Sequence, residues 1–134
     1  MMVIKIDGEI HSSKNSRRIM RGKNGAPFVA KSKSAKADEF YFWAQLTSQR
    51  ETWQNMVAGL PYPLTITFHF RRGTRCRFDY VNMAQGILDA MVKAGYLPDD
   101  SADYVIPAFQ PYTVEKTNPG CDLTIGDYLT GNNL

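Results

Sequence analysis

The stretch PLTITFHFRRGTRCRFDYVNMAQGILDAMVKAG, residues 63–95, contains the two clearest structural patterns in the chain and a cluster of charge between them. Residues 63–70 alternate apolar side chains with threonine or histidine, a pattern typical of a strand with one buried face. Residues 83–94 repeat apolar side chains at intervals of three and four, which predicts an amphipathic helix. Asn82 is the expected N-cap, and Gly95 stands where a helix commonly ends. The stretch therefore predicts a strand, a charged loop and a helix.

The segments on either side predict a second helix and several shorter strands. Strands are expected at residues 2–6, 27–30, 103–109, 111–116 and 121–125. Residues 8–26 are polar, basic and interrupted by glycines, which indicates a long loop or an open hairpin. A helix is expected from about residue 35 into the fifties, with Ser32 or Ser34 as its cap and an apolar stripe at Phe40, Trp43, Ala44, Leu46 and Trp53. This order predicts a single α+β domain over residues 1–134, with two main helices packed on a small mixed β-sheet.

Length and composition narrow the class of protein. A chain of 134 residues with 43% hydrophobic content can bury one core, and it is small enough that pairing with a second copy would add stability. It contains no run of about 18 apolar residues, and its N-terminus lacks the apolar region of a secretory signal, so we expect neither a membrane partner nor secretion. Cys76 and Cys121 are too few and too far apart for a disulfide framework or a zinc site, which favours reduced thiols in a cytoplasmic protein.

Charge is unevenly distributed along the chain, although the net charge is only +3. Residues 1–36 contain nine Lys or Arg and two acids, and residues 71–77 contain four Arg and no acid. From residue 78 onward there are eight acids and two lysines. Such asymmetry favours a polyanion partner, and nucleic acid is the partner that we expect. The alternative is a basic surface that binds no ligand.

Three carboxylates flank the helix expected over residues 83–94. Asp79 precedes it, and Asp99 and Asp100 follow it. Two carboxylates that hold Mg²⁺ are a common means of hydrolysing a phosphodiester. Each carboxylate also has an ordinary explanation, because acids are favoured near helix N-termini and in turns. The helix is about 18 Å long at 1.5 Å per residue, so residues 96–100 would have to double back along it to bring Asp79 and Asp100 together.

The same residues resemble the core of a known family. The runs Arg77-Phe78-Asp79-Tyr80-Val81-Asn82, Leu88-Asp89-Ala90-Met91 and Lys93-Ala94-Gly95-Tyr96-Leu97-Pro98-Asp99-Asp100 are similar, in order and spacing, to the RusA family of Holliday-junction resolvases. Lys14-Asn15-Ser16 and Ser32-Lys33 resemble the basic N-terminal segment of that family and its Ser-Lys stretch before a helix. The resemblance is dense over residues 77–104 and looser elsewhere. It implies a phage or prophage endonuclease, active as a homodimer, that cuts four-way DNA junctions with Mg²⁺ or Mn²⁺.

The resemblance assigns roles to individual residues. It implies that Asp79 and Asp100 bind the metal, with Asp99 as neighbour or substitute, and that Asn82 closes the motif. Val81 departs from the family, which has a second aspartate there, and Gln85 replaces a common lysine. Arginine and lysine contacts to phosphate give affinity without sequence specificity. The DNA contacts that we expect are Lys14, Arg17, Arg18, Lys31, Lys33, Arg71, Arg72, Arg75 and Arg77.

Two further hypotheses remain open. One is a catalytically impaired relative of the nuclease that binds branched DNA without cutting it, as Val81 suggests. The other is a small interaction domain whose acids are only helix caps and turn residues.

His11 and His69 have no partner at the spacing of a metal site or a nucleophile, so structural or surface roles are expected for both.

Overall fold

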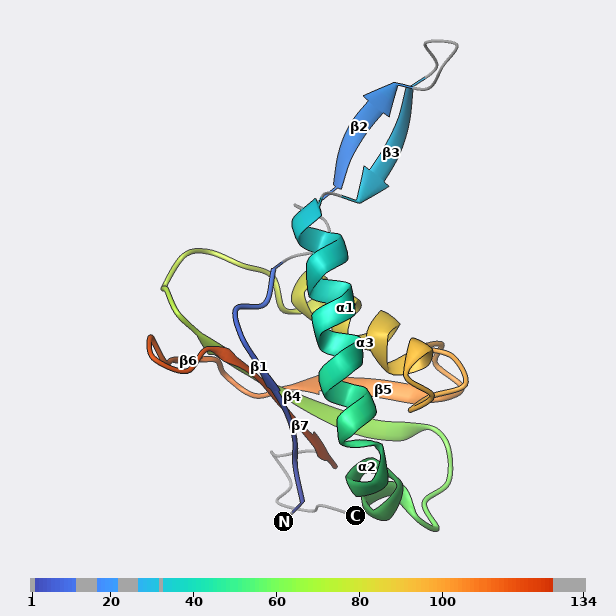
Figure 1. Cartoon of the computed structure of the whole chain (residues 1–134). Helices are drawn as coiled ribbons and strands as arrows, with labels where there is room; N and C mark the ends of the chain where they lie inside the picture. The colour runs from blue at the N-terminus through green and yellow to red at the C-terminus, as the bar shows by residue number, and fades with distance from the viewer. Residues whose placement is uncertain (1, 12–16, 22–26, 32, 127–134) are drawn as a thin grey trace.

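Strand β4 (Leu64–Arg72) lies at the centre of a mixed five-stranded sheet, as Figure 1 shows. The structure is a computed structural model that describes residues 2–11, 17–21, 27–31 and 33–126. On one side β4 pairs in parallel with β5 (Val105–Phe109) and β6 (Thr113–Val114), and on the other it pairs antiparallel with β7 (Gly120–Ile125). Strand β1 (Ile4–Asp7) pairs antiparallel with β7 and forms that outer edge. The predicted α+β class and mixed sheet are confirmed.

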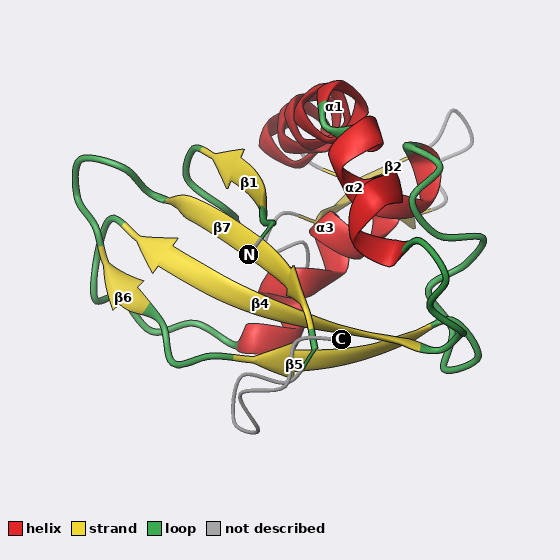
Figure 2. Ribbon diagram, turned by 90° about the horizontal axis from the view of Figure 1, so that it is seen from below, coloured by secondary structure: helices red, strands yellow, loops and turns green. Residues whose placement is uncertain are grey.

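Helices cover one face of this sheet, as Figure 2 shows. The described part of the chain contains α1 (Lys33–Ser48), α2 (Arg50–Val57) and α3 (Tyr80–Lys93). The prediction of two main helices is therefore wrong by one, because the long helix expected from about residue 35 is broken at Gln49. Ser34 lies inside α1 and so is not its cap, whereas Ser32 falls outside the described residues. None of the helices in the described ranges is long and apolar enough to cross a membrane.

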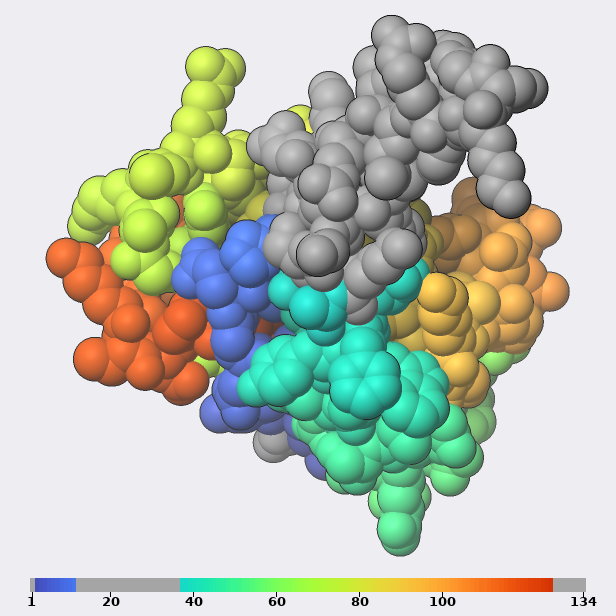
Figure 3. Space-filling model, turned by 45° about the horizontal axis from the view of Figure 1, so that its top comes forward, coloured from blue at the N-terminus to red at the C-terminus, as the bar shows by residue number. Residues whose placement is uncertain are grey.

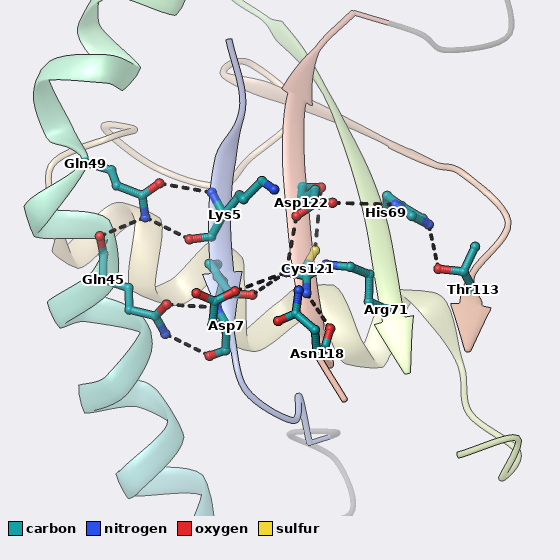
Figure 4. Close-up of polar contacts among 11 residues, drawn as sticks. Lys5, Asp7, Gln45, Gln49, His69, Arg71, Thr113, Asn118, Cys121 and Asp122 are labelled. Atoms are coloured by element: carbon teal, nitrogen blue, oxygen red, sulfur yellow. Dashed lines mark hydrogen bonds and ion pairs between the residues drawn. The ribbon is translucent and has the colours of Figure 1, made fainter. Parts of the chain in front are cut away.

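Two glutamines of the α1–α2 segment satisfy the outer edge of β1, as Figure 4 shows. The Asp7 N–H donates to Gln45 Oε1 at 2.8 Å, and Gln45 Nε2 donates to the Asp7 carbonyl at 3.0 Å. Gln49 makes the equivalent pair of bonds with Lys5, at 3.0 and 2.8 Å. Four residues of helix rise about 6 Å and two residues of strand about 6–7 Å, so the two spacings match. The two glutamine amides therefore make the hydrogen bonds that a neighbouring strand would make. Helix α1 ends at Ser48, just before Gln49.

The apolar stripe of α1 differs from the predicted one. Phe42 is 3% exposed and Leu46 is fully buried, whereas Phe40 is 69% and Trp43 40% exposed. The inward positions are 42, 45, 46 and 49, a helical spacing that includes both edge-binding glutamines. The spacing of apolar residues in the sequence could not identify this face, because two of its four residues are glutamines.

Helix α3 packs its predicted stripe into the core and ends as expected. Met83, Ala84, Ile87, Leu88 and Met91 are all buried. The Tyr96 N–H bonds the Met91 carbonyl at 2.9 Å and the Gly95 N–H bonds the Val92 carbonyl at 3.1 Å, while Gly95 has a φ of 81°. This is a Schellman end, in which a glycine adopts the left-handed conformation after the helix. The predicted role of Gly95 is confirmed.

Strands β2 (Arg17–Arg21) and β3 (Pro27–Lys31) form a separate two-stranded sheet. They pair antiparallel and extend beyond the start of α1, away from the main sheet (Figure 1). The hairpin interpretation of residues 8–26 and the strand predicted at 27–30 are therefore confirmed in outline. Five of the predicted DNA-binding residues belong to this region: Lys14 lies outside the described residues, and Arg17, Arg18, Lys31 and Lys33 have their backbones in β2, β3 and the first turn of α1.

On the sheet face opposite the helices, Arg71 connects three strands (Figure 4). Its Nη2 donates to the Ile6 carbonyl at 3.2 Å and lies 3.4 Å from Asp7 Oδ1 and 3.3 Å from Asp122 Oδ1. It reaches β1 by passing over Gly120 of β7, where a Cβ would lie 2.7 Å from Nη2. The arginine is 8% exposed, so these bonds offset the cost of burying its charge.

Both cysteines are free thiols, as the sequence predicts. Cys76 is exposed in the loop after β4, and Cys121 is fully buried in β7. Burial raises the pKa of Cys121, and the nearby carboxylate of Asp122 raises it further. The thiolate is the reactive form, so Cys121 is expected to be chemically inert while the protein is folded.

We predict that Gly120→Ala destabilises the protein. The added methyl would lie 2.1 Å from the Ile6 carbonyl oxygen as well as against Arg71, and overpacking of this kind costs about 1–3 kcal/mol. Gly86→Ala is the matched control, because its methyl would meet only Phe42 Cε2 at 3.8 Å and alanine favours a helix by about 0.5–1 kcal/mol. Urea unfolding of both variants measures the difference, and a Gly120→Ala variant as stable as wild type would contradict the close approach.

Candidate functional site

Asp79 is the N-cap of α3. Its backbone is extended, with φ −123° and ψ 124°, and its Oδ1 accepts a hydrogen bond from the Val81 N–H at 3.0 Å. The helix therefore begins at Tyr80, and the prediction that Asn82 caps it is wrong. Tyr80 joins an aromatic cluster with Phe78 and Phe70, with ring centroids 5.0 and 6.2 Å away, and this packing places the first turn earlier than the apolar periodicity indicates.

A hollow of about 830 Å³ opens beside this N-terminus. Segments far apart in sequence meet there, namely the residues after β1, the end of β4, the loop before α3 and the first turn of α3. In Figure 3 the blue N-terminal segment lies between the yellow-green loop after β4 and the teal part of α1. The polar side chains that line the hollow are Glu9, His11, Arg72, Arg77, Asp79 and Asn82. Both signs of charge are therefore present around one opening.

The arginine cluster is divided between the two faces of the sheet. Arg72 lies on the helix side, with its guanidinium 4.3 Å above the Phe78 ring and its Nη1 bonded to the Cys76 carbonyl at 2.9 Å. Arg72 and Arg77 line the hollow, whereas Arg75 lines a different depression with Lys116. Successive residues of a strand point to opposite faces, which is why Arg71 lies on the far side. Arg71 is buried and bonded within the protein, so the predicted DNA-binding role at this position is corrected to a structural one.

Asp99 and Asp100 lie along α3, away from the hollow. Gln85 Nε2 donates to Asp100 Oδ2 at 3.2 Å and to Asp89 Oδ1 at 3.0 Å. Residues 96–100 therefore run back along α3, but they bring Asp100 to Gln85 and not to Asp79. Asp100 lines a separate depression with Asp89, Asp99 and other residues, and Asp79 does not line it. Within residues 2–11, 17–21, 27–31 and 33–126, no three His, Cys, Asp or Glu side chains are gathered in a way that could hold one metal ion.

The donor set of the hollow nevertheless fits Mg²⁺ in a restricted way. Mg²⁺ keeps several waters and commonly takes one or two carboxylates together with substrate phosphates. Asp79 uses only Oδ1 in its cap bond, and its side chain is exposed at the hollow. Val81 also lines the hollow and is 64% exposed, but its side chain carries no donor atom for a metal.

Sequence reasoning missed two acids and a histidine of this region. Glu9 and His11 line the hollow, and His11 Nδ1 lies 2.6 Å from Oδ2 of Asp38 in α1. The sequence offers His11 no partner at the spacing of a metal site or a nucleophile, and the structure supplies one from a distant element. No short spacing could reveal the pair, because 27 residues separate its members and strand β1 and helix α1 bring them together.

Comparison with known proteins found no family model and no curated protein that matches the chain. The resemblance to the RusA family therefore depends on the motif residues themselves.

We predict that the two roles of Asp79 can be separated by substitution. Asp79→Ala removes the cap bond and is expected to lower the free energy of unfolding by about 1 kcal/mol. Asp79→Asn keeps an acceptor for the Val81 N–H and is expected to unfold close to wild type. Exposed Asp99→Ala is the control for loss of a carboxylate without loss of a cap. Urea denaturation compares the three, and equal stability of the Ala and Asn variants would show that the cap bond contributes nothing.

Proposed function

We propose that the chain is a structure-selective DNA endonuclease of the RusA type, which cuts four-way junctions with Mg²⁺ or Mn²⁺. The observation that carries the proposal is the hollow at the N-terminus of α3, where Asp79 lies among Arg72, Arg77 and Asn82. Helix N-termini and arginines both favour bound phosphate, and a carboxylate beside them is a metal ligand suited to phosphodiester hydrolysis.

In the proposed reaction, the residues of the hollow bind and orient one phosphodiester. Arg72 and Arg77 hold phosphate oxygens, and the contact of Arg72 with the Phe78 ring restricts its guanidinium to this side of the sheet. A divalent metal held by Asp79 would stabilise charge on the reacting phosphate. The family resemblance also implies Asp100 and Asp99 as ligands, and these two would have to move from their separate depression to reach the same metal. Asn82 supplies a neutral hydrogen-bonding group in the first turn of α3.

The alternative is a protein that binds branched DNA without cutting it. Three observations favour it: Val81 stands in the hollow, Asp79 is engaged as a helix cap, and Asp100 is held by Gln85 outside the hollow. The arginines of the hollow would serve binding equally well, because phosphate contacts need no metal. The two functions therefore share one surface and differ only in chemistry.

We also propose that the protein acts as a homodimer on cytoplasmic DNA. A four-way junction has two strands to be cut, and a two-fold dimer presents two equivalent sites. Phe40, Tyr41 and Trp43 are exposed along α1, with the rings of Phe40 and Trp43 6.1 Å apart. An exposed aromatic group of this kind supports the presence of a protein interface.

We predict metal-dependent cleavage of a labelled four-way junction and none of a linear duplex of the same sequence. Asp79→Asn and Asp100→Asn should abolish cleavage, and the Asn variant at 79 is informative because its cap bond is expected to remain. Chelator should have the same effect as the substitutions. Tight junction binding without cuts in either metal would favour the binding-only alternative, and Val81→Asp would then test whether one carboxylate is missing. Neither binding nor cleavage would favour an interaction domain.

We predict that the adjacent arginines Arg71 and Arg72 have different roles, the first in stability and the second in DNA binding. Arg72→Gln or Arg77→Gln should lower the slope of log affinity against log salt by about 0.9 for each phosphate that the variant no longer neutralises. Arg71→Gln removes the same charge from the opposite face, and it should instead lower stability by about 1–3 kcal/mol, because the buried Ile6 carbonyl and the partly buried Asp122 each lose a partner. Junction titrations at several salt concentrations, well below the melting temperature, distinguish the two. An unchanged slope for both hollow variants would place the phosphate-binding residues elsewhere.

A further inference from the structure

His11 is held by a carboxylate at the hollow that contains Asp79. Its Nδ1 lies 2.6 Å from Asp38 Oδ2, and the histidine and aspartate side chains are 50% and 20% exposed. His11 follows β1, whereas Asp38 is in α1, so the pair depends on the packing of these two elements. Asp38 lies outside the lining of the hollow, and His11 lies within it.

The bond to Asp38 fixes which nitrogen of His11 is free to react. In neutral imidazole one ring nitrogen donates and the other accepts, and a carboxylate on Nδ1 selects the tautomer with the proton there. Nε2 then carries the lone pair. Within the described part of the chain, the structure records no hydrogen bond to Nε2. A carboxylate that orients an imidazole in this way is the arrangement that general bases use.

Stability alone gives little reason for this pair. A half-exposed contact between an imidazole and a carboxylate contributes at most about 1 kcal/mol, because water screens it and two side chains must be ordered. The composition of the hollow gives a stronger reason. A second aspartate at position 81 would help a metal to activate water, and Val81 cannot do so. A nuclease with this site needs another group to take the proton of the attacking water.

We propose that His11 is that general base and that Asp38 is its positioning residue, an inference that rests on the proposed nuclease function. Nε2 takes a proton from water as the water oxygen forms a bond to phosphorus. The bond from phosphorus to the leaving deoxyribose oxygen breaks, and that oxygen takes a proton from solvent. His11 then releases its extra proton to bulk water, so that one water is consumed and no oxidant or reductant is needed.

Charged groups from several elements line the hollow together with His11. Glu9 is on the same segment, Arg72 is at the end of β4, Arg77 is in the loop before α3, and Asp79 caps α3. Asp38 contacts the imidazole directly, and the other four groups line the same hollow. The two arginines are the groups expected to hold the phosphate, so they are neutralised when substrate is bound.

The test is single-turnover cleavage of a four-way junction by His11→Ala, with junction affinity measured separately. General-base catalysis contributes about 100- to 10,000-fold, so the rate should fall by that factor while affinity stays within about twofold. Imidazole added to the buffer should restore part of the rate of His11→Ala and should have no effect on wild type or on Asp79→Asn. His69→Gln is the matched control, because the only other histidine of the chain lies between Thr113 and Asp122 and does not line the hollow.

Asp38 needs a measurement that a purely structural role would not change. Asp38→Asn should shift the ¹⁵N signals of His11 away from the tautomer protonated on Nδ1 and slow cleavage, and Asp38→Glu should restore both in part. Two histidines make these signals simple to assign with the His69→Gln variant.

The remaining outcomes overturn the inference in distinguishable ways. A His11→Ala variant that cuts within about threefold of wild type overturns it and leaves the nuclease in place. Parallel loss of affinity and rate, or loss of rate that imidazole cannot restore, assigns His11 to binding or to local structure. A wild-type protein that does not cut junctions overturns both the inference and the proposed activity.

Discussion

The guanidinium of Arg71 passes over Gly120 to reach the backbone of β1, and the arrangement of the hollow depends on that interaction. Strand β1 has only four residues and one strand neighbour, so its place in the sheet needs additional support. Arg71 gives this support from the side of β7, and Gln45 and Gln49 give it on the outer edge (Figure 4). Glu9 and His11 follow β1 directly, so whatever holds this strand also holds the two side chains that complete the hollow.

The parts of the fold that were predicted correctly are those that local periodicity determines. Strand β4 and helix α3 have one apolar face each, and the stripe expected on α3 is buried except at Val92, which is only partly buried. Helix α1 was misjudged because the inward positions at its C-terminal end include Gln45 and, just after the helix, Gln49, whose partners are backbone groups of β1 some 38 and 44 residues away. A hydrophobic pattern indicates which apolar side chains are buried. It carries no information about a side-chain amide that hydrogen-bonds the free backbone groups of an edge strand. The break between α1 and α2 could not be predicted for the same reason.

The candidate site shows the same division between local and long-range information. Asp79 and the arginines on either side of the β4 loop were found from the sequence, because they are close together along the chain. The side of the sheet on which each arginine lies was not predicted. Charge counting treats Arg71 and Arg72 as one cluster, whereas alternation along the strand places them on opposite faces. The His11–Asp38 pair joins residues 27 apart through two packed elements, and neither residue has a partner at short spacing. The sequence motifs therefore identified the candidate residues that are close together along the chain. The tertiary packing determined which other side chains line the same hollow.

The two departures from the RusA pattern have a joint physical consequence. Gln85 is neutral and donates to both Asp89 and Asp100, so it holds two carboxylates together without neutralising them. A lysine there would add a positive charge beside Asp89 and Asp100, and an aspartate in place of Val81 would add a negative charge in the hollow. In the proposed nuclease, Val81 leaves the hollow without that second carboxylate, so Asp79 would both cap α3 and hold the metal. Cleavage by such a site needs a proton acceptor from elsewhere in the fold, and a carboxylate-oriented imidazole at the same hollow has the chemistry for it.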